Sequence, residues 1–247
     1  MDLAYETTYH ELEEQHWWFQ SRRDFIFSLV QDLNLAKDTA LLEVGCSGGP
    51  LLQRLRHEGY TNLTGIDLSA PAIALARRRQ VPNVQVMDGA RLSFPTAAFD
   101  VVVASDVLEH IEDEQQALRE WLRVLRPGGC LLVFVPAFQL LWSDHDVVNH
   151  HFRRYSAEQL RQSLTRAGLH TQRQSYWNSA LFLPAAIVRL VQRLRPTSQS
   201  PPSGDLQVLP GILNGALLTL LRCENRLLRH VNLPVGISTF ALARKPV

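Results

Sequence analysis

The stretch Ala40-Leu41-Leu42-Glu43-Val44-Gly45-Cys46-Ser47-Gly48-Gly49-Pro50 decides the fold of this chain. An apolar run carries the acidic Glu43 near its end and passes into a glycine-rich turn, and Pro50 suits the first turn of a helix. The pattern predicts a buried strand, a turn whose backbone can approach a ligand closely, and a helix over residues 51–58.

The charge of Glu43 indicates which kind of ligand this turn favours. A dinucleotide pyrophosphate binds the N–H groups of a helix N-terminus, where a nearby carboxylate would repel it. We therefore expect a ligand that carries positive charge. S-adenosylmethionine, which has an ammonium and a sulfonium group, meets this requirement.

Two further acidic residues end predicted strands. Residues 62–69 predict a second strand, and Asp67 lies about 20 residues beyond the glycines, where a carboxylate can accept hydrogen bonds from ribose hydroxyls. Ser69 and Pro71 are typical of a helix start. Residues 84–90 predict a third strand and its turn, which contains Asp88.

The next apolar runs complete the predicted core. Residues 99–104 are almost all apolar and precede Ser105 and Asp106, which is typical of a strand buried on both faces of a parallel sheet. Residues 126–129 predict a turn into a fifth strand over residues 130–135. Strands that alternate with helices predict an α/β fold, with a doubly wound, mostly parallel sheet and ligands at the carboxyl ends of its strands.

These motifs resemble those of the class I S-adenosylmethionine-dependent methyltransferases of the type 11 group. The family's first motif is an acidic residue followed by three glycines at alternating positions. The chain keeps Glu43, Gly45 and Gly49, and Ser47 replaces the middle glycine. The resemblance covers residues 40–135 and implies a seven-stranded, Rossmann-like methyltransferase fold.

The resemblance also implies roles for the strand-end acids. It assigns Asp67 to the ribose and Asp88 to the adenine amino group. The expected cofactor-binding residues are Glu43, Gly45, Cys46, Gly49, Asp67, Leu68, Asp88, Gly89 and Ser105.

The 247 residues, 46% of them hydrophobic, are enough for one domain with a sizeable core. The expected organisation is an N-terminal helical lid (1–35), a cofactor-binding core (36–135), an acceptor-side loop, helix and strand (136–178), a helical insertion (179–236) with a linker at 196–208, and a final strand (237–247).

Methyl transfer from a sulfonium is an in-line displacement that requires alignment and the exclusion of water. An oxygen acceptor of high pKa also requires a base, and His110 after the fourth strand is one candidate; the alternative is that it packs or caps a helix. Asp106, Glu109 and His110 resemble an acidic grouping of the ubiquinone O-methyltransferases that can hold a divalent metal. We nevertheless expect no metal here.

The segment 141–155 holds the densest cluster of polar and aromatic residues and follows the fifth strand. It resembles the D-x-x-x-H-x-R-R-Y stretch of a subgroup of type 11 methyltransferases associated with sugar-polymer or lipid-carrier pathways. Its histidines can act as acids, bases or ligands, and Arg153 and Arg154 can bind an anionic group. An internal ion-pair network that orders the loop is an equal alternative.

The N-terminal segment contains Trp17, Trp18 and Phe19, which cannot all point inward from a helix that covers one face. They either contact the substrate as a lid or attach the helix to the domain. The expected catalytic residues are His110, His145 and His151, and the expected substrate-binding residues are Trp17, Trp18, Arg22, Asp146, Arg153, Arg154 and Tyr155.

The insertion contains two predicted amphipathic helices, near residues 183–194 and 212–231, whose charges are mainly arginines. Such helices either lie on an anionic membrane surface, here through residues 179–195 and 212–231, or cap the active site. Neither is apolar enough over its length to span a bilayer. Glu224 falls within the leucine stripe, where we expect a structural salt bridge.

The whole chain narrows the possible partners and location. A formal net charge of +1 argues against general nucleic-acid binding. Three cysteines and a polar, acidic start suggest a cytoplasmic protein, with the inner face of a membrane as a further possibility. The sequence does not indicate an oligomeric state.

Together these features predict transfer of a methyl group from S-adenosylmethionine to an oxygen of a small-molecule or lipid-linked acceptor. One alternative is C-methylation of a quinone or another lipophilic metabolite. Another is a protein that binds S-adenosylmethionine without catalysis.

Overall fold

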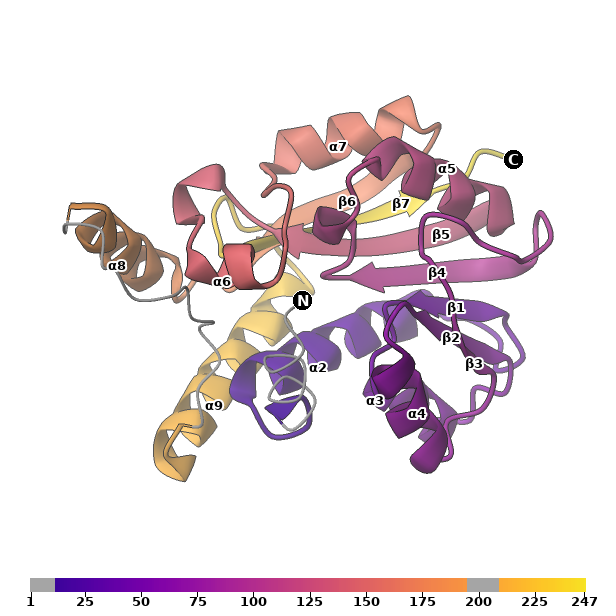
Figure 1. The fold of residues 1–247 in the computed structure, drawn as a ribbon, viewed down its shortest axis with the longest axis horizontal. Coiled ribbons are helices and arrows are strands. Elements are labelled where there is room, and N and C mark those ends of the chain that lie inside the picture. The colour runs from indigo at the N-terminus through magenta and orange to yellow at the C-terminus, as the bar shows by residue number, and fades with distance from the viewer. Residues whose placement is uncertain (1–11, 195–208) are drawn as a thin grey trace.

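The structure is a computed structural model that describes residues 12–194 and 209–247. In these residues seven strands form one sheet in the order β3-β2-β1-β4-β5-β7-β6 (Figure 1). The strands are β1 (Leu41–Val44), β2 (Leu63–Asp67), β3 (Val84–Val86), β4 (Phe99–Ser105), β5 (Leu125–Pro136), β6 (His170–Trp177) and β7 (Ser238–Arg244). β7 runs antiparallel to both β5 and β6, and the other neighbours are parallel. This confirms the predicted doubly wound, mostly parallel sheet.

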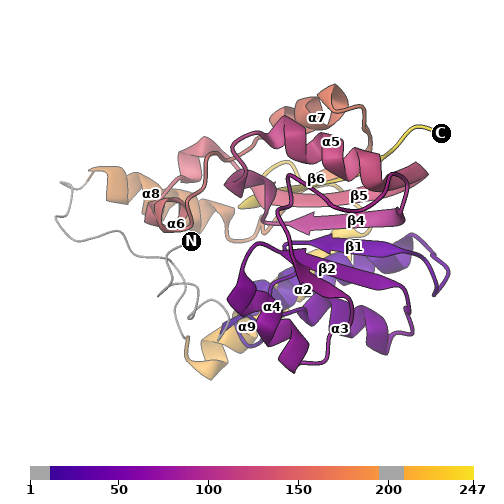
Figure 2. The same ribbon diagram turned by 45° about the vertical axis from the view of Figure 1, so that its right-hand side comes forward.

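Helices cover both faces of the sheet (Figures 1 and 2). They are α2 (Trp17–Asp32), α3 (Pro50–His57), α4 (Ala70–Arg78), α5 (Glu114–Val124), α6 (Asp144–Val148), α7 (Ala157–Arg166), α8 (Phe182–Leu194) and α9 (Gly211–Leu228), with short 3-10 turns η1 (Leu108–His110) and η2 (Gln139–Leu141). On one face α5 and α7 bury residues such as Trp121 and Leu160. On the other face α2, α3 and α9 bury Phe25, Leu52 and Leu221.

The local sequence explains where the core helices begin. Gly49 has a φ of 78°, and a Cβ atom there would lie 2.7 Å from a methyl group of Val81, so only glycine fits. α3 starts directly after it, at Pro50. The Ser69 side chain accepts a hydrogen bond from the Ala72 N–H at the start of α4, which confirms the predicted cap.

The predicted turn at residues 126–129 is wrong in one respect. These residues belong to β5, and the register between β4 and β5 shifts there between Phe99 and Val101. The segment is therefore an irregularity within a longer strand, and Gly128 takes a φ of 76° to accommodate it.

The insertion between β6 and β7 consists of α8 and α9, as the sequence predicts. α9 packs along α2. Asp24 of α2 pairs with Arg222 of α9, and Asp32 of α2 pairs with Arg229, which directly follows α9. The predicted linker at 196–208 and the first part of the predicted lid, residues 1–11, lie outside the described residues.

Glu224 corrects one expectation about the insertion. Among the residues that the structure describes, its buried carboxylate makes no salt bridge. It accepts hydrogen bonds from the backbone N–H groups of Ser179 and Ala180, at 3.0 and 2.9 Å. These donors lie just before α8, so Glu224 holds α9 to the start of α8.

We expect Glu224→Gln to lower the free energy of unfolding by about 1–3 kcal/mol, because one oxygen becomes an N–H group that faces a buried donor. Urea denaturation measures this. Glu58→Gln, at the exposed end of α3, is the matched control. Equal stability of the two variants would show that Glu224 does not hold the helices together.

Candidate active site

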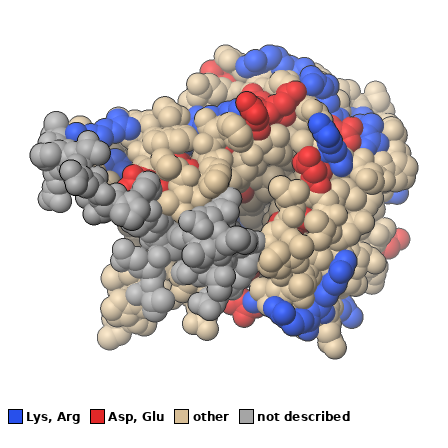
Figure 3. Space-filling view, in the orientation of Figure 1, with Lys and Arg blue, Asp and Glu red and all other residues tan. Residues whose placement is uncertain are grey.

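A cavity of about 1020 Å³ opens at the carboxyl ends of β1 to β5 (Figure 3). Its floor includes Gly45, Asp67 and Ser105, which follow or end strands, and its far wall comes from α2, residues 141–154 and α8. Pockets for one small molecule usually measure about 300–1,000 Å³. The cavity is therefore large enough for a methyl donor and an acceptor together.

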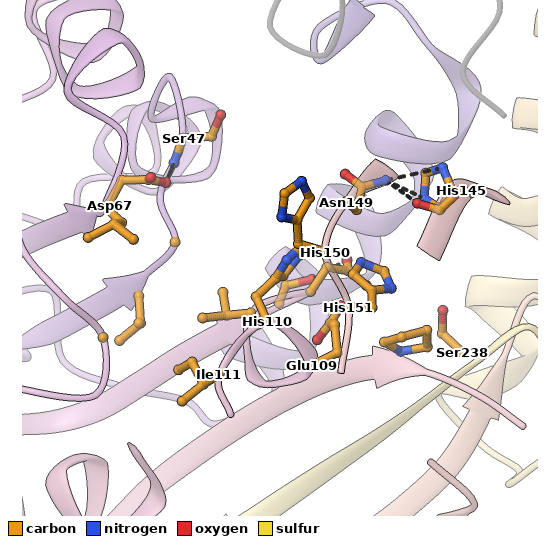
Figure 4. Close-up of a pocket in the computed structure, with 18 of the residues that line it drawn as sticks. Ser47, Asp67, Glu109, His110, Ile111, His145, Asn149, His150, His151 and Ser238 are labelled. Atoms are coloured by element: carbon orange, nitrogen blue, oxygen red, sulfur yellow. Dashed lines mark hydrogen bonds between the residues drawn. The ribbon is translucent and has the colours of Figure 1, made fainter. Parts of the chain in front are cut away.

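The part of the cavity near β2 presents an oriented carboxylate. Asp67 Oδ2 accepts a hydrogen bond from the Ser47 N–H at 2.9 Å, and Oδ1 accepts one from the Ser69 N–H at 2.8 Å (Figure 4). Ser47 has a φ of 48°, so it takes the left-handed conformation at the place of the missing glycine. Both backbone donors hold the acid at the tip of β2.

Other predicted cofactor-binding residues line the same part of the cavity. They are Gly45, Leu68, Asp88, Gly89 and Ser105. A Cβ atom on Gly45 would lie 2.3 Å from a methyl group of Val107, so the turn needs glycine there. A glycine turn beside two strand-end carboxylates fits a nucleoside with a cationic tail.

Glu43, Cys46 and Gly49 do not line the cavity. β1 is buried on both faces, and Glu43 lies within it. The Cys46 thiol lies in the core beside Gly65, and burial raises its pKa. Gly49 serves the packing of α3.

Glu43 lies in a region of concentrated negative charge. Burial raises the pKa of its carboxyl group well above the usual range, and the charges of Glu13 and Asp67 raise it further. Its Oε2 atom is buried and has no hydrogen-bond partner in the described chain. The surroundings of the glycine turn therefore favour a positively charged group.

Arg22 lies beneath the cavity and not in its lining. Its guanidinium group lies 4.2 to 5.2 Å from the ring centres of Trp18, Phe134 and Trp177. It donates to the Asp106 carboxylate at 2.9 Å and to the Ser238 hydroxyl at 2.6 Å. Arg22 thus joins α2 to the ends of β4 and β7 and supports the cavity floor.

A group of histidines forms the acceptor side of the cavity (Figure 4). The rings of His110 and His151 are 4.5 Å apart and nearly perpendicular. His151 Nδ1 lies 2.8 Å from Asp146 Oδ1, and Arg154 makes two hydrogen bonds to the same carboxylate, at 2.8 and 2.9 Å. Asp146 is fully buried, so it fixes the orientation of His151 and Arg154 from behind the cavity wall.

The protonation states of this group follow from its burial. Burial alone would raise the pKa of Asp146, but hydrogen bonds from His151 and Arg154 hold it well below its usual range. Burial lowers the pKa of His110 to about 3, with a further contribution from His151. Asp146 is therefore ionised and His110 neutral near neutral pH.

Glu109 is almost completely buried beside these histidines, and neither of its carboxylate oxygens has a hydrogen-bond partner in the described chain. Burial raises its pKa well above the usual range, and the negative charge of Asp106 adds to this. Ligand atoms of Glu109, His110 and His151 lie within 4.8 Å of one another, so these three residues could hold a metal ion.

We expect Glu109→Gln to change the dependence of stability on pH in buffer that contains a chelator. Because the pKa of Glu109 is raised on folding, its contribution is most favourable below about pH 4.3 and is lost as pH rises through the folded-state value. The variant should therefore gain stability over the wild type between acid and neutral pH. Chemical denaturation at several pH values measures this gain. A parallel pH dependence of the two proteins would contradict the assignment.

Arg153 and Tyr155 point away from the cavity. Both donate to the Glu114 carboxylate of α5, at 3.2 and 2.7 Å, and Ser163 of α7 donates to its other oxygen at 2.6 Å. Burial and the nearby Glu114 raise the pKa of the Tyr155 hydroxyl, which stays a donor. For these two residues the structure shows the internal network that the sequence left as an alternative to substrate binding.

The remaining expected residues do reach the cavity. Trp17, Trp18, His145 and Arg154 line it, and Trp18 also packs edge-on against Trp177 at 4.8 Å. The aromatic segment therefore forms part of the wall and attaches α2 to the sheet.

The polar residues that line the cavity and that the prediction omitted include Asn149, His150 and Ser238. His150 has a φ of 56°, and Figure 4 shows its ring directed into the cavity. The two consecutive histidines, His150 and His151, were the signal in the sequence that could have identified His150. The sequence offers no such signal for Ser238, at the start of β7.

The strand order, with an antiparallel β7 between β5 and β6, and a cavity with acids at the strand tips define the fold of the class I methyltransferases. Residues 42–133 match a family model described as "Methyltransferase domain". Residues 42–133 are therefore a domain similar to those of the S-adenosylmethionine-dependent methyltransferases.

Known proteins support this assignment to different extents. A protein of Mycolicibacterium smegmatis named "Probable S-adenosylmethionine-dependent methyltransferase" is 31% identical over 177 residues, which cover 70% of this chain and 66% of that relative. The 2-methyl-6-phytyl-1,4-hydroquinone methyltransferase of Synechocystis is 35% identical over 123 residues, or 47% of this chain and 39% of the relative. The chain thus spans less than two thirds of either protein.

A solved structure supports the fold alone. The phosphoethanolamine N-methyltransferase 2 of Haemonchus contortus, in complex with S-adenosyl-L-methionine, superposes with a TM-score of 0.61 at 18% identity. The match covers 93% of this chain and 53% of that structure.

Proposed function

We propose that this chain methylates an oxygen atom of a small-molecule or lipid-linked acceptor, with His151 as the general base. The observation that carries the proposal is the pair of Asp146 and His151, 2.8 Å apart, at the acceptor side of the cavity. The bound donor supplies an electrophilic methyl carbon on its sulfonium group.

The pair suits proton removal from a hydroxyl group. Asp146 is ionised and accepts the hydrogen bond from His151 Nδ1–H, which leaves Nε2 as the proton acceptor. When His151 takes the proton, the negative charge of Asp146 stabilises the resulting imidazolium. His110, with a pKa near 3, is too weak a base for this role and is assigned to positioning.

Aromatic and apolar residues on the acceptor side favour a lipophilic acceptor. Trp17, Trp18, Phe19 and Phe152 line the cavity there. Rings of this kind exclude water and stack on an aromatic acceptor. The Synechocystis relative, named for a phytyl hydroquinone, supports a phenolic or hydroquinone acceptor with an apolar chain.

To test this, the protein is incubated with isotopically labelled S-adenosylmethionine and with hydroquinones that carry or lack a prenyl chain. Nuclear magnetic resonance then locates the labelled methyl group. We expect an O-methyl product and better turnover of the prenylated compounds. A ring-bound methyl group would favour C-methylation. S-adenosylhomocysteine binding without turnover of any acceptor would support the non-catalytic alternative.

A further inference from the structure

α8 exposes a continuous apolar surface. Figure 1 shows it projecting from the body of the molecule, and its described contacts are near η2, through the rings of Phe138 and Phe182 and a hydrogen bond from Arg193 to the Gln139 carbonyl. The exposed side chains of α8 include Leu183, Ile187, Val188, Leu190 and Val191, with exposed fractions of 42 to 68%.

α9 also has an apolar face that nothing in the described chain covers. Its side toward α2 and the sheet buries Leu221 and Leu228, whereas Ile212, Leu220 and Leu227 are exposed on the other side. Ile212, near the start of the helix, is 92% exposed. The spacing of the exposed residues places them along one stripe of the helix.

The charges beside these surfaces have one sign. α8 contains Arg189 and Arg193 and no acidic residue. The single acid of α9, Glu224, is buried and holds Ser179 and Ala180, while Arg226 is exposed. A partner that matches these helices is therefore apolar and negatively charged.

We propose that the exposed faces of α8 and α9 dock on a bilayer that contains anionic lipids. Aliphatic side chains flanked by arginines match the boundary between acyl chains and headgroups, where arginines reach the phosphates. No helix in the described part of the chain has the length and apolarity to cross a bilayer, so the contact is interfacial.

The position of α8 connects this surface to the cavity. Ala185 and Arg189 of α8 line the cavity, while Leu183 and Ile187 of the same helix are exposed. Docking through α8 would place the cavity beside the lipid, where a membrane-dissolved acceptor can enter. Binding to lipid itself does not depend on the methyl-transfer reaction and is measured without acceptor.

The test is co-sedimentation of the full chain with phosphatidylcholine vesicles that contain or lack phosphatidylglycerol. We expect binding to the anionic vesicles and a marked decrease in about 0.5 M salt, because salt screens charges at the surface. Ile187→Glu is expected to lower the partition coefficient at least about tenfold, since a charge replaces an aliphatic group that the bilayer would bury. Arg193→Gln and Arg226→Gln should each lower it about fivefold.

Two controls separate loss of docking from loss of folding. Arg78→Gln removes the same charge from the exposed surface of α4 and should leave vesicle binding unchanged. Affinity for S-adenosylhomocysteine should be the same in all variants, which shows that the core is intact.

Three results would overturn the proposal. The first is a wild-type chain that remains in the supernatant with anionic vesicles. The second is binding that Ile187→Glu does not reduce. The third is a dimer in sedimentation velocity without lipid that Ile187→Glu dissociates, because the apolar surface would then join two copies. Methyl transfer can succeed or fail in each case, so the two proposals are tested separately.

Discussion

Asp146→Asn is expected to lower the free energy of unfolding by about 3–5 kcal/mol and to abolish most of the turnover, because it leaves the buried Arg154 without its counter-charge. The same change removes the acceptor that orients His151. Denaturation measures the first effect and transfer of labelled methyl groups measures the second.

The control and the pH dependence make this prediction specific. Asp144→Asn, on the exposed first turn of α6, changes the same charge and should be nearly neutral. Because folding lowers the pKa of Asp146, its stabilisation is present above about pH 4 and is lost as pH falls toward the folded-state value. The difference between wild type and variant should therefore shrink in acid. A difference that is constant with pH would contradict the ion-pair account.

Asp67→Asn is expected to weaken binding of S-adenosylhomocysteine by about 10- to 100-fold, because we expect the charged carboxylate of Asp67 to accept hydrogen bonds from the ribose hydroxyls. Two backbone N–H groups already orient the carboxylate, so no rearrangement offsets the loss. Isothermal titration calorimetry measures the affinity.

Asp38→Asn is the matched control, since this exposed acid precedes β1 and lies outside the cavity lining. The affinity of this control for S-adenosylhomocysteine should equal that of the wild type. If Asp67→Asn binds S-adenosylhomocysteine as tightly as the control does, Asp67 does not bind the ribose.

The sequence predicted those features that depend on neighbours along the chain. The strand-tip position of Asp67 follows from an apolar strand and a spacing of about 20 residues after the glycine turn. The capping box of Ser156 and Gln159 at the start of α7 is equally local, because its two residues are three positions apart.

Residues with distant partners could not be placed in this way. Arg22 was expected to bind substrate, but it contacts Asp106 and Ser238, which lie 84 and 216 positions away. Arg153 was expected to face the acceptor, but Glu114, 39 positions away, holds it outside the cavity. A polar cluster such as segment 141–155 indicates that its side chains contact other polar groups. Only the fold determines which of these side chains face the cavity.

Glu43 shows a further limit of pattern-based prediction. Its place two residues before Gly45 correctly indicates a negatively charged environment around the turn. Whether the side chain reaches the ligand depends on how deeply β1 is buried. The sequence of a four-residue strand does not reveal that both of its faces are buried.

The most direct test of the proposed mechanism compares His151→Gln with the wild type in two measurements on the same preparation. A general base contributes about 10²–10⁴-fold, so kcat/KM for methyl transfer should fall by that factor, while the Kd of S-adenosylhomocysteine stays unchanged. Unchanged kcat/KM, or a loss of donor affinity as large as the loss of rate, would contradict the assignment of His151 as the base.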